Sequence, residues 1–178
     1  MIRPNQRYYQ RNFGGWEGEF RFAITDRAAF RSAPFGILDR CRVLTTVYAP
    51  RLVGPLRIET QVDLRPDRDR PDTMLHQLRI SKWGVLLYGT DEVFTLEEDG
   101  LAVTIRATER MFPLLWWGRE WPICTGVVDE AGDAAHYSIP WFGTTLDIRA
   151  RITAEGVELA MSTPWASGLQ HLRRTDDR

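Results

Sequence analysis

The chain has 178 residues, 43% of them hydrophobic, which suits one ordinary domain with a sizeable core, and we predict a single domain over residues 1–178. Its 23 basic and 24 acidic residues give a formal net charge of -1, so nucleic-acid binding through bulk positive charge is not expected. No apolar run approaches the length of a membrane span, and residues 1–7 lack the apolar segment of a secretory signal. Cys41 and Cys124 are far apart and lack metal-type spacing, so we expect a soluble, cytoplasmic protein.

Alternation of apolar and polar residues, the two-residue period of a half-buried strand, begins near the N-terminus. Over residues 16–24 the even positions are apolar or glycine, and the odd positions are mostly charged. Residues 26–31 predict a short helix that their first residue, an aspartate, would cap. The alternation returns at 58–64 and 74–80, and the prolines and mixed charges of 65–72 predict a solvated loop between these strands.

The second half of the chain repeats the pattern. Further alternating segments and the turns between them follow in chain order: a turn at 98–100, strands at 101–107 and 146–152, a turn at 154–156, a strand at 157–161, and a less regular closing strand at 167–173. About eight to ten strands with short turns and little helix predict an all-β fold, an antiparallel up-and-down β-barrel. A split-barrel flavin binder is the best structural rival, although nothing in the sequence marks a flavin phosphate site.

A short motif at the start of the first long strand indicates a family. Gly14-Gly15-Trp16 resembles the Gly-x-Trp motif of the lipocalins and the wider calycin group. The resemblance implies that Trp16 closes the narrow end of the barrel beneath an arginine from the last strand. Arg173, or its neighbour Arg174, would fill that role, because a guanidinium stacks on an indole face and donates hydrogen bonds to nearby carbonyls. The family's Thr-Asp-Tyr turn has only a poor match at residues 89–91, and its C-terminal helix has no counterpart.

Strand parity selects polar side chains that would point into the barrel. His76, Glu92 and Tyr137 each share the parity of apolar residues on their own strands. A carboxylate on an apolar face has a raised pKa, and a histidine beside it can exchange a proton with it near neutral pH. We therefore predict Glu92 and His76 as a proton-transfer pair, with Tyr137 as a donor to a developing oxyanion. The alternative is that Glu92 lies at a strand end in water and His76 is a hydrogen-bonded core residue.

The same parity predicts which residues line a ligand cavity. They are Phe20, Phe22, Thr60, Met74, Phe94, Met161 and His171, the last if the closing strand is in phase with Leu169. No metal site is predicted, because the three histidines lack a metal-ligand spacing and His136 has the parity opposite to Tyr137. Neither a nucleophile motif nor a phosphate loop is present, so no cofactor is expected.

Two functions fit this sequence. The first is binding of a small hydrophobic molecule in the barrel, with the polar trio making the protein a cofactor-independent isomerase, cyclase or dehydratase. The alternative is a non-catalytic intracellular carrier or sensor of a hydrophobic ligand. Lipocalin-like barrels serve in both roles, so the resemblance does not separate them. We expect a monomer or a homodimer whose main partner is that small molecule.

Overall fold

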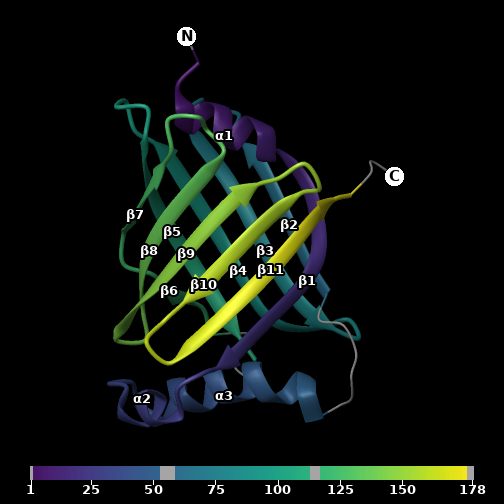
Figure 1. Cartoon of the computed structure of the whole chain (residues 1–178), viewed down its shortest axis with the longest axis vertical. Helices are drawn as coiled ribbons and strands as arrows, with labels where there is room; N and C mark the ends of the chain where they lie inside the picture. The colour runs from purple at the N-terminus through teal and green to yellow at the C-terminus, as the bar shows by residue number, and fades with distance from the viewer. Residues whose placement is uncertain (1, 53–58, 113–116, 176–178) are drawn as a thin grey trace.

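The structure is a computed structural model that describes residues 2–52, 59–112 and 117–175. For residues 45–52 and 59–61 it describes only the backbone. Figure 1 shows the helices and strands along the chain. In chain order they are α1 (Pro4–Asn12), β1 (Gly14–Ile24), α2 (Arg27–Ser32), α3 (Ile37–Leu52), β2 (Glu59–Pro66), β3 (Thr73–Lys82), β4 (Val85–Leu96), β5 (Ala102–Met111), β6 (Arg119–Glu120), β7 (Cys124–Val128), β8 (Ala134–Trp141), β9 (Thr144–Ile152), β10 (Val157–Ser162) and β11 (Ala166–Arg174).

The sheet closes on itself. Within the described residues, ten strands pair antiparallel in the ring order β4-β3-β2-β1-β11-β10-β9-β8-β7-β5, and β5 pairs with β4 to complete it. The two-residue strand β6 pairs with β5 beside the ring. The prediction of an all-β antiparallel barrel is confirmed. Closure leaves a long barrel strand no free edge for another chain to pair with.

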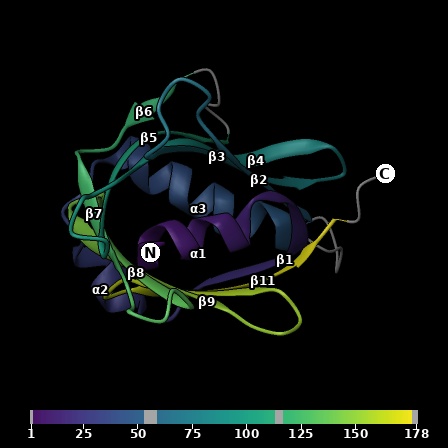
Figure 2. The ribbon, with the colours of Figure 1, turned by 90° about the horizontal axis from the view of Figure 1, so that it is seen from above.

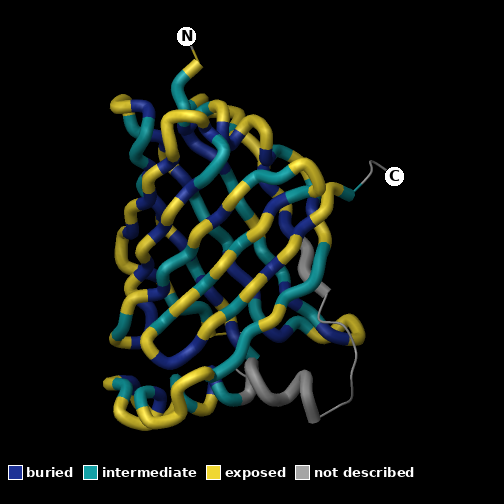
Figure 3. Tube along the Cα trace, viewed as in Figure 1, coloured by how far each residue is buried: buried dark blue, intermediate teal, exposed yellow. Residues whose placement is uncertain are grey.

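The two-residue alternation of burial runs through the barrel wall, as Figure 3 shows along the tube. On β5 the odd positions from Val103 to Met111 are buried, and Arg106 and Arg110 between them are exposed. On β8 the inward series includes Tyr137, while His136 is exposed. The apolar faces predicted for the strands thus meet inside the barrel, where they form the main core.

Helices close the two ends of the barrel, as Figures 1 and 2 show, with α1 at one end and α2 and α3 at the other. The predicted short helix is α2, and the Asp26 carboxylate accepts hydrogen bonds from the N–H groups of Ala28 and Ala29. The other two helices were not predicted. None of the described helices is both long enough and apolar enough to cross a membrane.

Tertiary contacts hold α1 across the barrel end. The Asn5 amide, fully buried, donates to the backbone oxygens of Glu97 and Ala102, each at 3.1 Å. Tyr8 and Tyr9 are buried in the core, and the Trp16 indole N–H donates to the Asn12 oxygen at 2.8 Å. The helix is only nine residues long, too short to be stable alone, so contacts with the barrel account for its stability.

The arginine that covers Trp16 is Arg174, so the choice of Arg173 was wrong. The Arg174 guanidinium lies 5.0 Å from the centre of the Trp16 ring and donates to the Arg11 backbone oxygen at 2.9 Å. Trp16 pairs with Arg174 across β1 and β11, so the two side chains share one face of the sheet. Arg173 pairs with Glu17 and is exposed on the other face.

Candidate ligand-binding site

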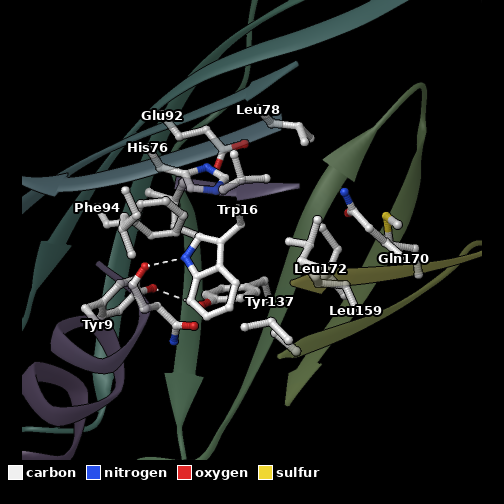
Figure 4. Close-up of a pocket in the computed structure, with 18 of the residues that line it drawn as sticks. Tyr9, Trp16, His76, Leu78, Glu92, Phe94, Tyr137, Leu159, Gln170 and Leu172 are labelled. Carbon is white, nitrogen blue, oxygen red and sulfur yellow. Dashed lines mark hydrogen bonds and ion pairs between the residues drawn. The ribbon is translucent and has the colours of Figure 1, made fainter. Parts of the chain in front are cut away.

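Two cavities lie inside the barrel, of about 120 Å³ and about 100 Å³. The first, drawn in Figure 4, reaches α1 at Tyr8 and Tyr9, and the second reaches α3 at Val43. They share six lining residues: Leu78, Glu92, Trp121, Ile148, Met161 and Gln170. The two cavities are therefore adjacent sections of the barrel interior, with mainly apolar walls.

Most of the predicted lining residues face these cavities. Phe20 and Phe22 line the second, Phe94 lines the first, and Met161 lines both. The Phe20 and Phe22 rings are stacked with their centres 5.9 Å apart. Their inward orientation was predicted correctly because apolar and charged residues alternate along β1 from Trp16 onward.

Of the other predicted lining residues, Met74 does not reach a cavity wall, and the side chain of Thr60 is not described. Met74 is buried in the core next to the barrel end, and the lining of the cavities does not include it. Thr60 is part of β2, but its side chain lies outside the described residues. Its predicted role stays a prediction.

His76 and Glu92 meet in the first cavity. They are direct cross-strand partners on β3 and β4, and His76 Nδ1 lies 2.9 Å from Glu92 Oε2. Thr90 donates its hydroxyl to Glu92 Oε1 at 2.5 Å, so each carboxylate oxygen has a partner. The side chains are 20% and 10% exposed, which makes this a largely buried pair. The alternative that placed Glu92 in water is wrong for this structure, because the β4 parity turns its side chain inward.

Tyr137 lies in the same cavity but bonds to a different partner. Its hydroxyl and the Tyr9 hydroxyl are 2.9 Å apart, and either can be the donor. Burial raises the pKa of Tyr137 well above 10, and the neighbouring Tyr9 adds to the effect. Burial likewise raises the pKa of Tyr9. Both phenols therefore stay neutral at ordinary pH, as a hydrogen-bonding pair separate from His76 and Glu92.

His171 points away from the cavities, so its predicted inward orientation was wrong. Its side chain is 56% exposed and Nδ1 lies 3.5 Å from the Glu158 carboxylate on β10. On β11 the inward positions are those of Gln170 and Leu172, not those of Leu169 and His171. Apolar residues occur on both faces of β11, which is why the sequence gave no clear parity there.

Gln170 is a cavity residue that sequence reasoning missed. It is 2% exposed, lines both cavities, and its amide Nε2 has no hydrogen-bond partner among the described residues. Figure 4 shows its side chain beside Leu159 and Leu172. An inward phase assigned to Leu172 would have found it. Tyr9 was also missed, because no helix was predicted around it.

A second buried carboxylate, Glu109, was missed as well. It is fully buried, and its Oε1 lies 2.7 Å from Arg119 Nε in an ion pair. Its Oε2 accepts from the Trp141 indole at 3.1 Å and from the Tyr88 hydroxyl at 3.3 Å. Glu109 lies six residues after Val103 on β5, so it has the same parity, and that parity would have placed its side chain inside the barrel. Arg119 and these donors occupy both of its oxygens, so we assign Glu109 a structural role, and two of its partners, Tyr88 and Trp141, line the second cavity.

We also looked for a metal site and a cysteine nucleophile in the described part of the chain. It contains no cluster of three or more histidine, cysteine, aspartate or glutamate side chains that could hold a metal ion. His136 faces outward, 3.3 Å from Asp147. Burial raises the pKa of the Cys124 thiol, which donates to the Pro122 oxygen, so this cysteine is a poor nucleophile.

Comparisons with known proteins bear on the fold. No family model matches the chain, and no curated protein matches it. Among solved structures it is similar to the REP1-NXSQ fatty acid transporter, with a TM-score of 0.53 and 12% identity over 95% of this chain and 99% of that one. It is also similar to a Schistosoma mansoni fatty acid binding protein in complex with arachidonic acid, with a TM-score of 0.50 and 13% identity over 92% and 96% of the two chains.

These matches establish the class of fold. The chain forms a calycin-like β-barrel, strongly divergent in sequence, and the resemblance based on Gly14-Gly15-Trp16 is confirmed. At this level of identity the likeness concerns the fold alone. What the barrel contains has to be argued from its own residues.

Proposed function

We propose that this protein binds a small hydrophobic molecule inside its barrel and holds it without changing it chemically. The observation that carries the proposal is the pair of adjacent, largely apolar cavities that share six lining residues. A dry apolar cavity of about 150 Å³ can hold a molecule the size of benzene. Adjacent cavities of about 120 and 100 Å³ suit a slender chain or a small ring system.

The likeness to two proteins named for fatty acids supports this proposal at the level of fold. Apolar cavities within such barrels are where a hydrophobic ligand loses its contact with water, which is the main source of affinity for this kind of molecule. The fold therefore suits a carrier or sensor of a hydrophobic ligand.

Catalysis has weaker support. His76 and Glu92 are in contact, but Tyr137 is hydrogen-bonded to Tyr9, and no hydrogen bond among the described residues joins it to the pair. The three predicted residues thus belong to two separate hydrogen-bonded pairs, His76 with Glu92 and Tyr137 with Tyr9.

The proposal can be tested by filling the first cavity. Ala150 is buried on β9 and lines that cavity, whereas Ala160 on β10 is exposed outside the barrel. Titration with 1-octanol, followed by calorimetry and by the fluorescence of the cavity tryptophans, should give saturable binding. We expect Ala150→Leu to weaken it by about tenfold, which is roughly 1.4 kcal/mol, and Ala160→Leu to leave it unchanged.

Two results would overturn the proposal. One is the absence of saturable binding by the wild-type protein, together with the absence of any retained apolar molecule in native mass spectrometry of freshly purified protein. The other is equal binding by both leucine variants, which would place the ligand outside the first cavity. Thermal unfolding of each variant checks that the barrel is intact.

A further inference from the structure

Among the described residues, the lining of the two cavities includes one carboxylate but neither a lysine nor an arginine. The lining residues with polar side-chain atoms are Tyr8, Tyr9, Asn12, His76, Tyr88, Glu92, Tyr137 and Gln170, together with the indole groups of Trp16, Trp121 and Trp141. The cavities therefore offer hydrogen-bonding groups and a single carboxylate, Glu92, whose partners are the His76 imidazole and the Thr90 hydroxyl.

The buried or half-buried cations near the barrel interior are engaged elsewhere. Arg119 pairs with Glu109 at 2.7 Å and lies over the Phe142 ring at 4.0 Å. Arg42, on α3, lies 3.7 Å from the Asp39 carboxylate and donates to a backbone oxygen. The Lys82 ammonium lies 5.3 Å from the centre of the Trp83 ring. None of the three is part of the cavity lining.

A carboxylate on the ligand would meet unfavourable surroundings in the first cavity. Glu92 already holds the His76 imidazole on one oxygen and the Thr90 hydroxyl on the other. A second carboxylate would be buried beside the first without a cation of its own, and burial of an uncompensated charge is strongly unfavourable. Two carboxylates that share an apolar site also repel each other, so one of them would have to take up a proton.

Neighbouring tyrosines are affected by the same carboxylate. Burial is the main cause that raises the pKa of Tyr9 and of Tyr137, and Glu92 contributes to both shifts. A negative potential that disfavours a phenolate also disfavours a ligand anion in the same place. The cavity thus favours groups that carry no negative charge.

An uncharged oxygen, in contrast, would find donors without partners. The Gln170 amide Nε2 is buried where the two cavities adjoin, and it has no hydrogen-bond partner among the described residues. A buried donor left without an acceptor is unfavourable, and a ligand oxygen that accepts from it removes that penalty. The hydroxyls of Tyr8, Tyr9 and Tyr137 interact with one another, and the group at the end of this series can donate its hydrogen to a ligand oxygen.

We infer that the barrel selects an uncharged apolar molecule with a carbonyl or hydroxyl oxygen and rejects the matching carboxylate. Gln170 donates to the ligand oxygen, and Glu92 repels an anion. This inference rests on the proposed function and adds the chemical class of the ligand. It separates this chain from what the names of its structural neighbours suggest, since a free fatty acid is a carboxylate at neutral pH.

The test compares four molecules that share one hydrocarbon chain: 2-octanone, 1-octanol, octanoate and octylammonium. Calorimetric titration of the full chain at about pH 8 should give the ketone and the alcohol an affinity at least about tenfold above that of octanoate. Lowering the pH to about 4.5, where octanoic acid gains its proton, should narrow that ratio in the unmodified protein. This second measurement needs no variant that could fail to fold.

Variants assign the effect to residues. Glu92→Gln removes the charge and keeps the shape, so octanoate should approach the affinity of 1-octanol to within about threefold. Glu158→Gln is the matched control, because Glu158 also pairs with a histidine but lies outside the barrel, and the ratio should not change. Gln170→Leu should weaken 2-octanone by about fivefold to tenfold.

The outcomes separate the two proposals. If octanoate binds as tightly as 1-octanol, or if octylammonium binds most tightly, the inference about an uncharged ligand is overturned while binding itself stands. An octanoate affinity that Glu92→Gln leaves unchanged also contradicts it. If none of the four molecules binds, both the inference and the proposed function fail.

Discussion

The barrel wall contains two histidine–glutamate pairs with the same cross-strand geometry but on opposite faces. His76 lies opposite Glu92 on β3 and β4, and His171 lies opposite Glu158 on β10 and β11. The first pair points inward, with side chains 20% and 10% exposed and 2.9 Å between His76 Nδ1 and Glu92 Oε2. The second points outward, with exposures of 56% and 52% and a distance of 3.5 Å.

The difference shows that the face of the sheet, more than the residue types, decides what such a pair can do. Outside, water and salt screen the attraction, and a pair of this kind contributes about 0–1 kcal/mol. Inside, the charge of Glu92 acts over a longer range in an apolar cavity, where the Thr90 hydroxyl and the His76 imidazole hold it in place. A ligand in the cavity meets the inner pair and never the outer one.

The largest effect on the free energy of unfolding should follow from ionising the buried tyrosines at high pH. Burial raises the pKa of Tyr8, Tyr9, Tyr88 and Tyr137 well above 10. The folded protein therefore keeps these protons at a pH where the unfolded chain loses them, so stability is full below about pH 10 and falls above it. The loss approaches about 1.4 kcal/mol per pH unit for each phenol.

Urea unfolding between about pH 8 and pH 11 measures this loss, and phenolate absorbance follows the titration itself. Tyr137→Phe should reduce the slope above about pH 10, because one buried phenol is removed. Normal titration of all tyrosines near pH 10 in the folded protein would show that the interior is wet, and the contrast between the two faces would then be lost.

Removal of a fully buried carboxylate should have the next largest effect. Glu109→Ala leaves Arg119 without its partner, and it leaves the Trp141 indole and the Tyr88 hydroxyl without an acceptor. We expect a loss of about 3 kcal/mol in the free energy of unfolding by urea. Glu158→Ala, on the outer face, should stay within about 0.5 kcal/mol and serves as the control.

Truncation of the two histidines compares the pairs directly. His76→Ala should lower the free energy of unfolding by about 2 kcal/mol, because one oxygen of the largely buried Glu92 carboxyl group then loses its hydrogen-bond partner. His171→Ala should change it by less than about 0.5 kcal/mol. Equal losses in the two variants would mean that the buried position of the first pair adds nothing.

Salt dependence should separate the pairs further, with a smaller effect. A double-mutant cycle on His171 and Glu158 should give a coupling that fades as salt rises to about 1 M, where the screening length is about 3 Å. The coupling between His76 and Glu92 should change little. A coupling of the inner pair that disappears in salt would show that ions reach it.

The smallest effect concerns the two arginines at the end of β11, which also differ only in face. Arg174→Ala removes the guanidinium over Trp16 and its bond to the Arg11 oxygen, so we expect a loss of about 1 kcal/mol. Arg173→Ala should be close to neutral, because that side chain is exposed. A larger loss for Arg173→Ala than for Arg174→Ala would instead support Arg173 as the arginine that covers Trp16.

Strand parity was predictable wherever one face of a strand is clearly apolar. The alternation around Trp16, His76 and Phe94 placed these residues inside, and the structure places them there. β11 was misread because Leu169 and Leu172 are apolar residues on opposite faces, so the local pattern allowed two phases. That single ambiguity put His171 inside, hid Gln170, and favoured Arg173 over Arg174.

The amino-acid sequence by itself determined the barrel, because the period of two is a local property of each strand and the Gly14-Gly15-Trp16 motif marks where the first one begins. Only the tertiary structure decided which side chains line the interior of the barrel. Pairing with β1 fixed the phase of β11, and packing against the strands held α1 and its Tyr9 across the barrel end. Both depend on contacts between residues far apart in the chain, such as Trp16 with Arg174, and no local pattern records such contacts.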